Sequence, residues 1–222
     1  MEERKGIEEE NAIELKGVYK MFGKENILKN INLICKRGSI TGIIGRNGSG
    51  KTVLFKCICG FLKPEQGEIY IHGMNIKEKK YSSGRIGAII ENPAFLEQYS
   101  GLKNLELLYC IRNKWDKNHI REIMHQVGLD PDSKKVVGKY SMGMKQRLAI
   151  AQAIMEEQDI LIMDEPMNGL DNRGVDEICK LFTLLKEEGK TILMSSHNKE
   201  DIQRLCEQVL EMDDGILRKA GD

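Results

Sequence analysis

The sequence predicts an α/β protein with three parts: an antiparallel β part on the N-terminal side, a core built on a mixed sheet, and a helical lobe inserted into that core. Short β-type runs recur along the chain, and several are continuously apolar, such as "ILIM" within "DILIMD". Such runs are typical of strands that are buried on both faces of a sheet covered by helices. The β-type runs stop between about residues 97 and 157, where only helical patterns remain.

The expected elements follow in a simple order. The runs "AIELKGV", "ITGIIG", "EIYIHG" and "RIGAII" are predicted strands, and turn signals such as "KRGS" and "IHGMN" separate them. Three predicted helices come next: "GLKNLELLYCIRNKW", "HIREIMHQVG" and "MKQRLAIAQAIMEEQ". The later runs "DILIMD", "TILMSS" and "QVLEMDDGILR" are strands again, alternating with helices such as "GVDEICKLFTLLKEEG". We therefore expect one domain over residues 1–222, with the core at 12–96 and 158–218 and the lobe at 97–157.

The composition narrows the class of protein. Of the 222 residues 41% are hydrophobic and 31% are charged, and 34 basic residues balance 34 acidic ones. Because no basic field remains, no nucleic-acid partner is expected. The N-terminus is charged rather than apolar, and no apolar run approaches the ~20 residues that a membrane-spanning helix needs. Apart from Cys57 and Cys59 the cysteines are scattered, so we expect buried thiols in a reducing cytoplasm rather than a metal site.

The run "GRNGSGKT", from Gly45 to Thr52, fits the pattern G-x-x-x-x-G-K-[ST] of a P-loop. It follows an apolar strand and precedes the helical pattern "KTVLFKCICGFL", which is the context that this loop requires. Its glycines let successive backbone N–H groups surround a phosphate at a helix N-terminus. We expect Lys51 to reach the β- and γ-phosphates of a nucleotide and the Thr52 hydroxyl to face Mg²⁺.

Two carboxylates, Asp164 and Glu165, end the apolar strand "ILIM". Adjacent carboxylates can simply cap a helix, but ligands of parallel α/β sheets bind at the carboxyl ends of the strands. Beside a P-loop, we expect Asp164 to bind Mg²⁺ and Glu165 to be the general base that polarises a water for attack on the γ-phosphate. His197 follows another apolar strand at the same edge. A lone histidine is usually structural, but at this place we expect a contact with the γ-phosphate.

The stretch "YSMGMKQR", residues 140–147, combines an ordinary feature with an unusual one. Ser141 ahead of a helical pattern is a standard N-cap. Gly143 in the first turn is less expected, because glycine weakens a helix by roughly 1 kcal/mol relative to alanine. A need for close access to the backbone at this point would explain the glycine.

Together these motifs resemble those of the ATP-binding cassette (ABC) ATPases, in that family's order and over about residues 12 to 218. "ILIMDEP" resembles the Walker B motif, "NGLD" (Asn168–Asp171) the D-loop, and "YSMGMKQR" the signature, usually written LSGGQ. Ser141 and Gly143 match the signature. The stretch departs from it at Tyr140, Met142 and Met144. The resemblance implies a P-loop ATPase core, ATP and Mg²⁺ as cofactors, and a head-to-tail homodimer in which the signature of one chain faces the γ-phosphate held by the other.

The resemblance also assigns roles to individual residues. Phe22 stands where the family has the aromatic residue that stacks on adenine, with Tyr19 as the alternative. The residues expected to bind the nucleotide are Phe22, Gly45, Arg46, Asn47, Gly48, Ser49, Gly50, Lys51, Thr52, Val53, Ser141, Gly143 and Met144. The expected catalytic residues are Glu165, His197 and Lys51, and the expected metal ligands are Thr52, Asp164 and Glu91.

Two departures from the family pattern bear on mechanism. Glu91, in "IGAIIENPAF", stands where the family's Q-loop usually has glutamine, a form that resembles bacitracin-resistance and lantibiotic-immunity exporters. A third carboxylate near Asp164 and Glu165 would either tighten metal binding or raise the pKa of one carboxyl group through like-charge repulsion. Val53 replaces a hydroxyl residue of many relatives, which is expected to cost one hydrogen bond, about 0.5–1.5 kcal/mol.

The implied function is the ATP-hydrolysing motor subunit of an exporter, with drugs or antimicrobial peptides as candidate cargo. A separate integral-membrane permease would hold this cytoplasmic chain at the inner face of the cell membrane. The candidate contact is the segment from Glu91 to Gly101, through Pro93, Phe95, Leu96 and Tyr99, unless these side chains pack inside the lobe.

Two other functions remain open from the sequence. The first is a soluble ABC ATPase of translation or DNA repair, against which the single cassette and the lack of a coiled-coil pattern count. The second is a regulatory nucleotide-binding module without catalysis, against which Glu165 and His197 count.

Overall fold

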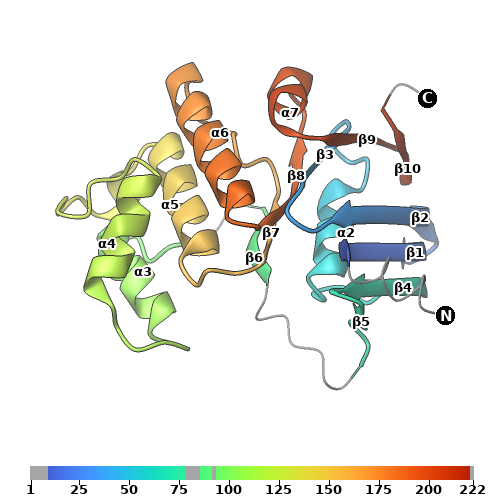
Figure 1. Cartoon of the computed structure of the whole chain (residues 1–222), viewed down its shortest axis with the longest axis horizontal. Helices are drawn as coiled ribbons and strands as arrows, with labels where there is room; N and C mark the ends of the chain where they lie inside the picture. Colours follow the sequence, from blue (N-terminus) through green and yellow to red (C-terminus); the bar gives the residue numbers. More distant parts are fainter. Residues whose placement is uncertain (1–9, 79–85, 92–93, 221–222) are drawn as a thin grey trace.

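The computed structural model describes residues 10–78, 86–91 and 94–220 and builds them on two sheets (Figure 1). The first is a four-stranded antiparallel sheet in the order β2-β1-β4-β5. Its strands are β1 (Asn11–Phe22), β2 (Glu25–Lys36), β4 (Gln66–Ile71) and β5 (Met74–Asn75). This sheet corresponds to the antiparallel β part that the sequence predicts on the N-terminal side.

The second sheet has six strands in the order β10-β9-β3-β8-β7-β6. They are β3 (Ile40–Ile44), β6 (Ile86–Ile89), β7 (Ile160–Met163), β8 (Thr191–Ser196), β9 (Gln208–Asp213) and β10 (Ile216–Lys219). All pairs are parallel except β9 with β10, so the sheet is mixed. Along β7, Ile160 and Ile162 join one hydrophobic cluster while Leu161 and Met163 join the other. Burial on both faces is why this strand is apolar at every position.

Helices cover both faces of the mixed sheet. Helix α2 (Lys51–Ile58) lies between the two sheets, where its buried Leu54 and Phe55 belong to the same cluster as side chains of both. Helices α6 (Asn172–Glu187) and α7 (Lys199–Leu205) cover the opposite face, with Phe182 and Ile202 fully buried there. Figure 1 shows α2 beside β1 and β2, and α6 on the side of the lobe.

The helical lobe contains α3 (Gly101–Tyr109), α4 (Lys117–Gln126), the short 3₁₀ helix η2 (Val137–Lys139) and α5 (Met142–Ile154). Its buried side chains form one continuous cluster with the α6 face of the core. A polar link reinforces this contact, because Arg147 Nη1 donates to the Val127 carbonyl in the lobe at 2.7 Å and Nη2 to Glu177 on α6 at 2.7 Å. No helix within the described ranges is long and apolar enough to span a membrane.

The predicted fold class is confirmed, although several elements differ from the expectation. Strand β2 is not among the predicted runs, and Met74–Asn75, expected in a turn, form β5. Helix α3 ends at Tyr109 instead of running on to Trp115. The predicted single strand "QVLEMDDGILR" is a hairpin, because Asp214 (φ 45°) and Gly215 (φ 75°) form a turn of two left-handed residues between β9 and β10. Helix α7 was not predicted, since its seven residues are mostly charged.

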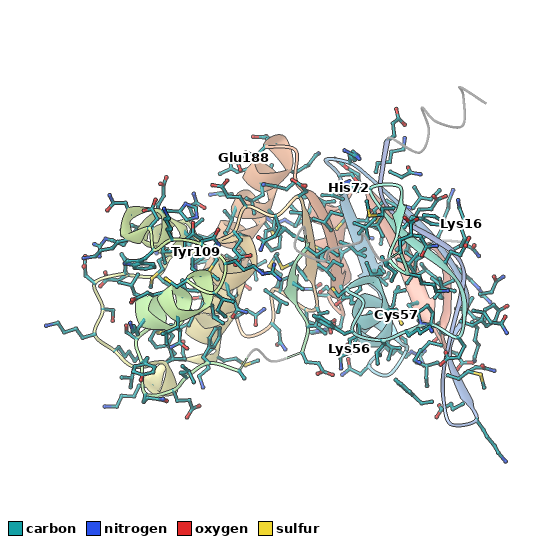
Figure 2. The ribbon with its side chains drawn as sticks, turned by 90° about the horizontal axis from the view of Figure 1, so that it is seen from below. Lys16, Lys56, Cys57, His72, Tyr109 and Glu188 are labelled. Atoms are coloured by element: carbon teal, nitrogen blue, oxygen red, sulfur yellow. The ribbon has the colours of Figure 1, made fainter. Side chains whose placement is uncertain are left out.

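The cysteines differ in their exposure to solvent. Burial raises the pKa of Cys35, Cys59 and Cys206 to about 12 and that of Cys57 to about 11. We call these four the shielded thiols; Figure 2 labels Cys57, which belongs to α2. Cys110, by contrast, is exposed, so the expectation of buried thiols is wrong for this residue. It is the C-cap residue of α3.

Candidate functional site

The P-loop connects β3 to α2 and leaves the start of that helix uncapped. Gly50 is the N-cap and has φ 111°, a left-handed value that favours glycine. Every other α-helix in the described part of the chain has an N-cap side chain that accepts a backbone N–H bond, whereas α2 has none. The backbone N–H groups at the start of α2 are therefore available to an anion.

The polar side chains of this loop are also arranged for an anion. Lys51 is 6% exposed, and its Nζ donates to the carbonyl oxygens of Gly45 at 2.7 Å and Arg46 at 3.0 Å, so the lysine lies folded over the loop. Ser49 Oγ is buried and has no hydrogen-bond partner in the structure. Buried hydroxyl groups are rarely left without a partner. Both observations fit a loop that receives phosphate oxygens.

Asp164 is held by two hydroxyl groups from two different elements. Thr52 Oγ1 donates to Oδ2 at 2.6 Å, and Ser195 Oγ donates to Oδ1 at 2.6 Å. Ser195 Oγ also accepts the backbone N–H of Glu165 at 3.0 Å. Ser195 is a site residue that was not predicted. A signal existed, because Ser195 and Ser196 end β8, the strand paired with β7, and Asp164 directly follows β7. Met163 lies opposite Met194 in that pair.

Glu165 and His197 are in direct contact. Glu165 Oε2 lies 2.8 Å from the ring Nδ1 of His197 and 3.2 Å from its backbone N, so both nitrogens donate to the carboxylate. Glu165 has φ 52°, a strained value for a residue with a Cβ, which is common at functional sites. The Gln146 amide on α5 donates to the Pro166 carbonyl at 3.0 Å and reaches the Glu165 carbonyl at 3.4 Å. Side chains from three elements thus fix the loop that follows β7.

A cleft of about 820 Å³ separates the core edge from the lobe. From the core it is lined by Asn47, Thr52, Glu91, Asp164, Glu165 and Asn168, and from the start of α5 by Tyr140, Met142, Lys145 and Gln146. The P-loop, the strand-end carboxylates and the predicted Q-loop residue therefore face one space.

Glu91 contacts a lysine rather than the other carboxylates. Its Oε1 lies 2.6 Å from Nζ of Lys56 on α2. No group of three His, Cys, Asp or Glu side chains able to hold a metal occurs in the described ranges. The hydroxyl of Thr52 and the carboxylate of Asp164 nevertheless converge, and oxygen donors of this kind suit Mg²⁺, which keeps water and phosphate oxygens as its other ligands. These residues fit the ion.

The structure explains both features of the signature stretch within one chain. Ser141 is the N-cap of α5, and its Oγ accepts the Met144 N–H at 3.2 Å. A Cβ on Gly143 would lie 2.9 Å from the carbonyl oxygen of Gly169, so glycine permits close packing on the predicted D-loop. Tyr140 is buried in the lobe, where its hydroxyl accepts the Gly101 N–H at 3.3 Å.

The remaining candidates lie in different surroundings. Phe22 ends β1 and is 49% exposed, with Lys20 Nζ 5.4 Å from its ring centroid, so its ring is open to a ligand. Tyr19 is only half-buried. Val53 packs against the cluster between the sheets and Met144 against the cluster of the lobe, which gives both an apolar role.

In the candidate docking segment, Leu96 and Tyr99 are exposed. Phe95 instead packs partly buried against the cluster of the lobe, as the alternative reading of this segment expected. Pro93 lies outside the described residues.

Comparison with known proteins decides the family. A family model described as "ABC transporter" matches residues 28–168. The chain is an ABC transporter ATP-binding domain. The predicted enzyme class, an ABC ATPase that binds adenine nucleotides, is thereby confirmed.

Three relatives of this ABC domain are informative. It is 42% identical over 200 residues to the bacitracin transport ATP-binding protein BcrA of Bacillus licheniformis, covering 89% of this chain and 65% of BcrA. It is 32% identical over 212 residues to the lantibiotic transport ATP-binding protein SrtF of Streptococcus pyogenes, covering 95% of this chain and 91% of SrtF. Among solved structures, the dimeric MJ0796 cassette superimposes with a TM-score of 0.84 at 26% identity, covering 95% of this chain and 99% of that one.

Proposed function

We propose that this ABC domain is the motor subunit of an exporter. Two copies pair head to tail around two ATP molecules, and hydrolysis drives a separate permease that holds the pair at the inner face of the cell membrane. The observation that carries the proposal is the packing of Gly143 on Gly169 of its own chain. This contact holds the start of α5 against the D-loop of its own chain, and we infer that the signature that reaches the phosphates on one P-loop comes from a second chain.

The residues of one chain divide the work of hydrolysis. Lys51 and the N–H groups at the start of α2 would bind the β- and γ-phosphates, and Thr52 and Asp164 would hold Mg²⁺, with Glu91 as a further ligand. A bound magnesium ion neutralises charge on the phosphate oxygens. Glu165 accepts a proton from the attacking water.

His197 orients the carboxylate of Glu165 through its backbone N–H and its ring Nδ1–H. A neutral ring that donates from Nδ1 leaves Nε2 as an acceptor. The γ-phosphate contact expected of His197 therefore requires either a protonated ring or a ring that has turned away from Glu165.

The experiment is the oligomeric state of Glu165→Gln with and without ATP and Mg²⁺, measured by light scattering after size exclusion. Removal of the base should trap the pair, so ATP should convert monomers into dimers. Ser141→Arg, added to Glu165→Gln, should abolish the dimer without preventing nucleotide binding. Asn118→Arg, at an exposed position in the first turn of α4, is the matched control and should leave the dimer intact. A Glu165→Gln chain that binds ATP yet stays monomeric would refute the unaided head-to-tail pair.

For the cargo, we propose antimicrobial peptides or related drugs, because BcrA is a bacitracin transport protein and SrtF a lantibiotic transport protein. Deletion of the chain from the cell that carries it should lower the inhibitory concentration of bacitracin or of a lantibiotic. Unchanged resistance to both would exclude this cargo and leave the ATPase assignment untouched. The permease contact is proposed at the exposed Leu96 and Tyr99, so Leu96→Asp should release the chain from isolated membranes while its nucleotide affinity is kept.

A further inference from the structure

Lys56 and Glu91 form an ion pair at the edge of the nucleotide cleft. Lys56 Nζ lies 2.6 Å from Glu91 Oε1, and the two side chains are 28% and 62% exposed. Lys56, labelled in Figure 2, follows Thr52 by four residues on α2, so both lie on one face of the helix about one turn apart. A cation therefore lies one helical turn from the hydroxyl group that contacts Asp164.

The backbone directs Glu91 into this place. Glu91 comes just after β6 and has φ 60°, a left-handed value that is uncommon for a residue with a Cβ. Its side chain lines the same cleft as Thr52 and Asp164. Lys145 also lines the cleft, but its ammonium group pairs with Glu97 at 3.5 Å. Of these two lysines, Lys56 therefore pairs with Glu91 and Lys145 pairs with Glu97.

We propose that Lys56 is a positioning residue for Glu91 and competes with Mg²⁺ for its carboxylate. The inference rests on the proposed function, in which Glu91 faces the metal from the Q-loop position. An ammonium group and a metal ion repel each other, so both cannot share this carboxylate without cost. Ion pairs this exposed are weak and exchange easily. Lys56 holds Glu91 against the core while the cleft is empty and releases it when the metal and nucleotide enter.

The same pair accounts for a glutamate at a position where the wider family has glutamine. An uncompensated third carboxylate would add negative charge beside Asp164 and Glu165 in the absence of metal. Lys56 offsets that charge. A glutamine would not bind the lysine ionically, so the competition requires both Lys56 and Glu91.

The test measures the dissociation constant of a fluorescent, non-hydrolysable ATP analogue in Mg²⁺ and in EDTA. We call the constant in EDTA divided by the constant in Mg²⁺ the magnesium enhancement. Lys56→Gln should raise this enhancement about two- to fivefold, the range of an exposed ion pair, and high salt should reduce the difference. Lys56→Arg, which keeps the charge, should match the parent chain. Lys186→Gln is the matched control, because Lys186 is 35% exposed and pairs with Glu207 near the start of β3, away from the P-loop.

The decisive comparison adds Glu91→Gln. In that background Lys56→Gln should no longer change the magnesium enhancement, and thermal unfolding should show that all variants are folded. The inference is overturned if Lys56→Gln leaves the magnesium enhancement unchanged or lowers it. It is also overturned if Lys56→Gln raises the enhancement equally in the Glu91 chain and in the Glu91→Gln chain. If the parent chain binds the analogue in neither buffer, the proposed function itself is overturned. That outcome is distinct from the failure of the inference, in which the variants bind the analogue but have the same magnesium enhancement.

Discussion

Replacement of Ser195 by alanine should both lower the free energy of unfolding and weaken magnesium binding. Ser195 is fully buried and makes two hydrogen bonds, one to the Asp164 carboxylate at 2.6 Å and one from the Glu165 N–H at 3.0 Å. A bond to a charged group contributes about 1.5–3 kcal/mol and a neutral one about 0.5–1.5 kcal/mol. The free energy of unfolding should therefore fall by about 2–4 kcal/mol. With a urea m-value of about 2 kcal/mol per molar, the midpoint should fall by about 1–2 M.

The functional half of this prediction rests on the proposed role of Asp164 in binding Mg²⁺. Hydrogen bonds to a metal-binding carboxylate typically affect metal affinity about ten- to a hundredfold. The magnesium concentration that gives half-maximal ATPase activity should rise by such a factor in Ser195→Ala.

Thr191→Val is the control at the other end of β8. It removes one bond, from the Gly38 N–H at 3.0 Å, and should cost only about 0.5–1.5 kcal/mol with no change in magnesium use. If Ser195→Ala behaved like Thr191→Val in both assays, Ser195 would be no more than an ordinary buried serine.

Three further predictions concern other parts of the chain. Gly143→Ala should lower the unfolding temperature despite alanine's higher helix propensity, because its Cβ would lie 2.9 Å from the Gly169 carbonyl oxygen. An increase of about 1 kcal/mol in the free energy of unfolding would show that the neighbouring loop can move aside for a methyl group. At pH 8 iodoacetamide should modify Cys110 first, with mass spectrometry finding the shielded thiols unmodified, since a raised pKa leaves little thiolate. Arg147 holds the pKa of Glu177 below its ordinary 4.5, so the pair stabilises the fold above that value and loses this effect as the pH falls. Glu177→Gln should therefore lower the unfolding temperature at pH 7 and should match the parent chain well below pH 4.5.

The parts that the sequence predicted well depend on local pattern. The P-loop, the carboxylates after β7 and the histidine after β8 are each identified by an apolar strand and the residues that follow it. Parallel pairing then brings the ends of these strands together, as the contact of Glu165 with His197 shows. Binary patterning likewise sufficed for the lobe helices, because their apolar spacing matches the period of a helix.

The parts that it missed depend on pairs of side chains far apart in the sequence. Ser195 lies 31 residues from Asp164, and Lys56 lies 35 residues from Glu91. No periodicity links such positions, and only strand order and register bring them into contact. Gly143 was noticed as unusual, but its neighbour Gly169 belongs to an irregular loop whose path a pattern cannot specify.

The packing of Gly143 against Gly169 leaves no clearance for a methyl group between α5 and the loop that begins at Glu165. A displacement of either segment toward the other therefore requires the other to shift as well. In a head-to-tail pair, the start of each α5 would lie on the nucleotide of the other chain. Loss of a phosphate beside one Glu165 would then displace the α5 residues that contact the second nucleotide. Hydrolysis in one pocket would therefore affect nucleotide binding in the other.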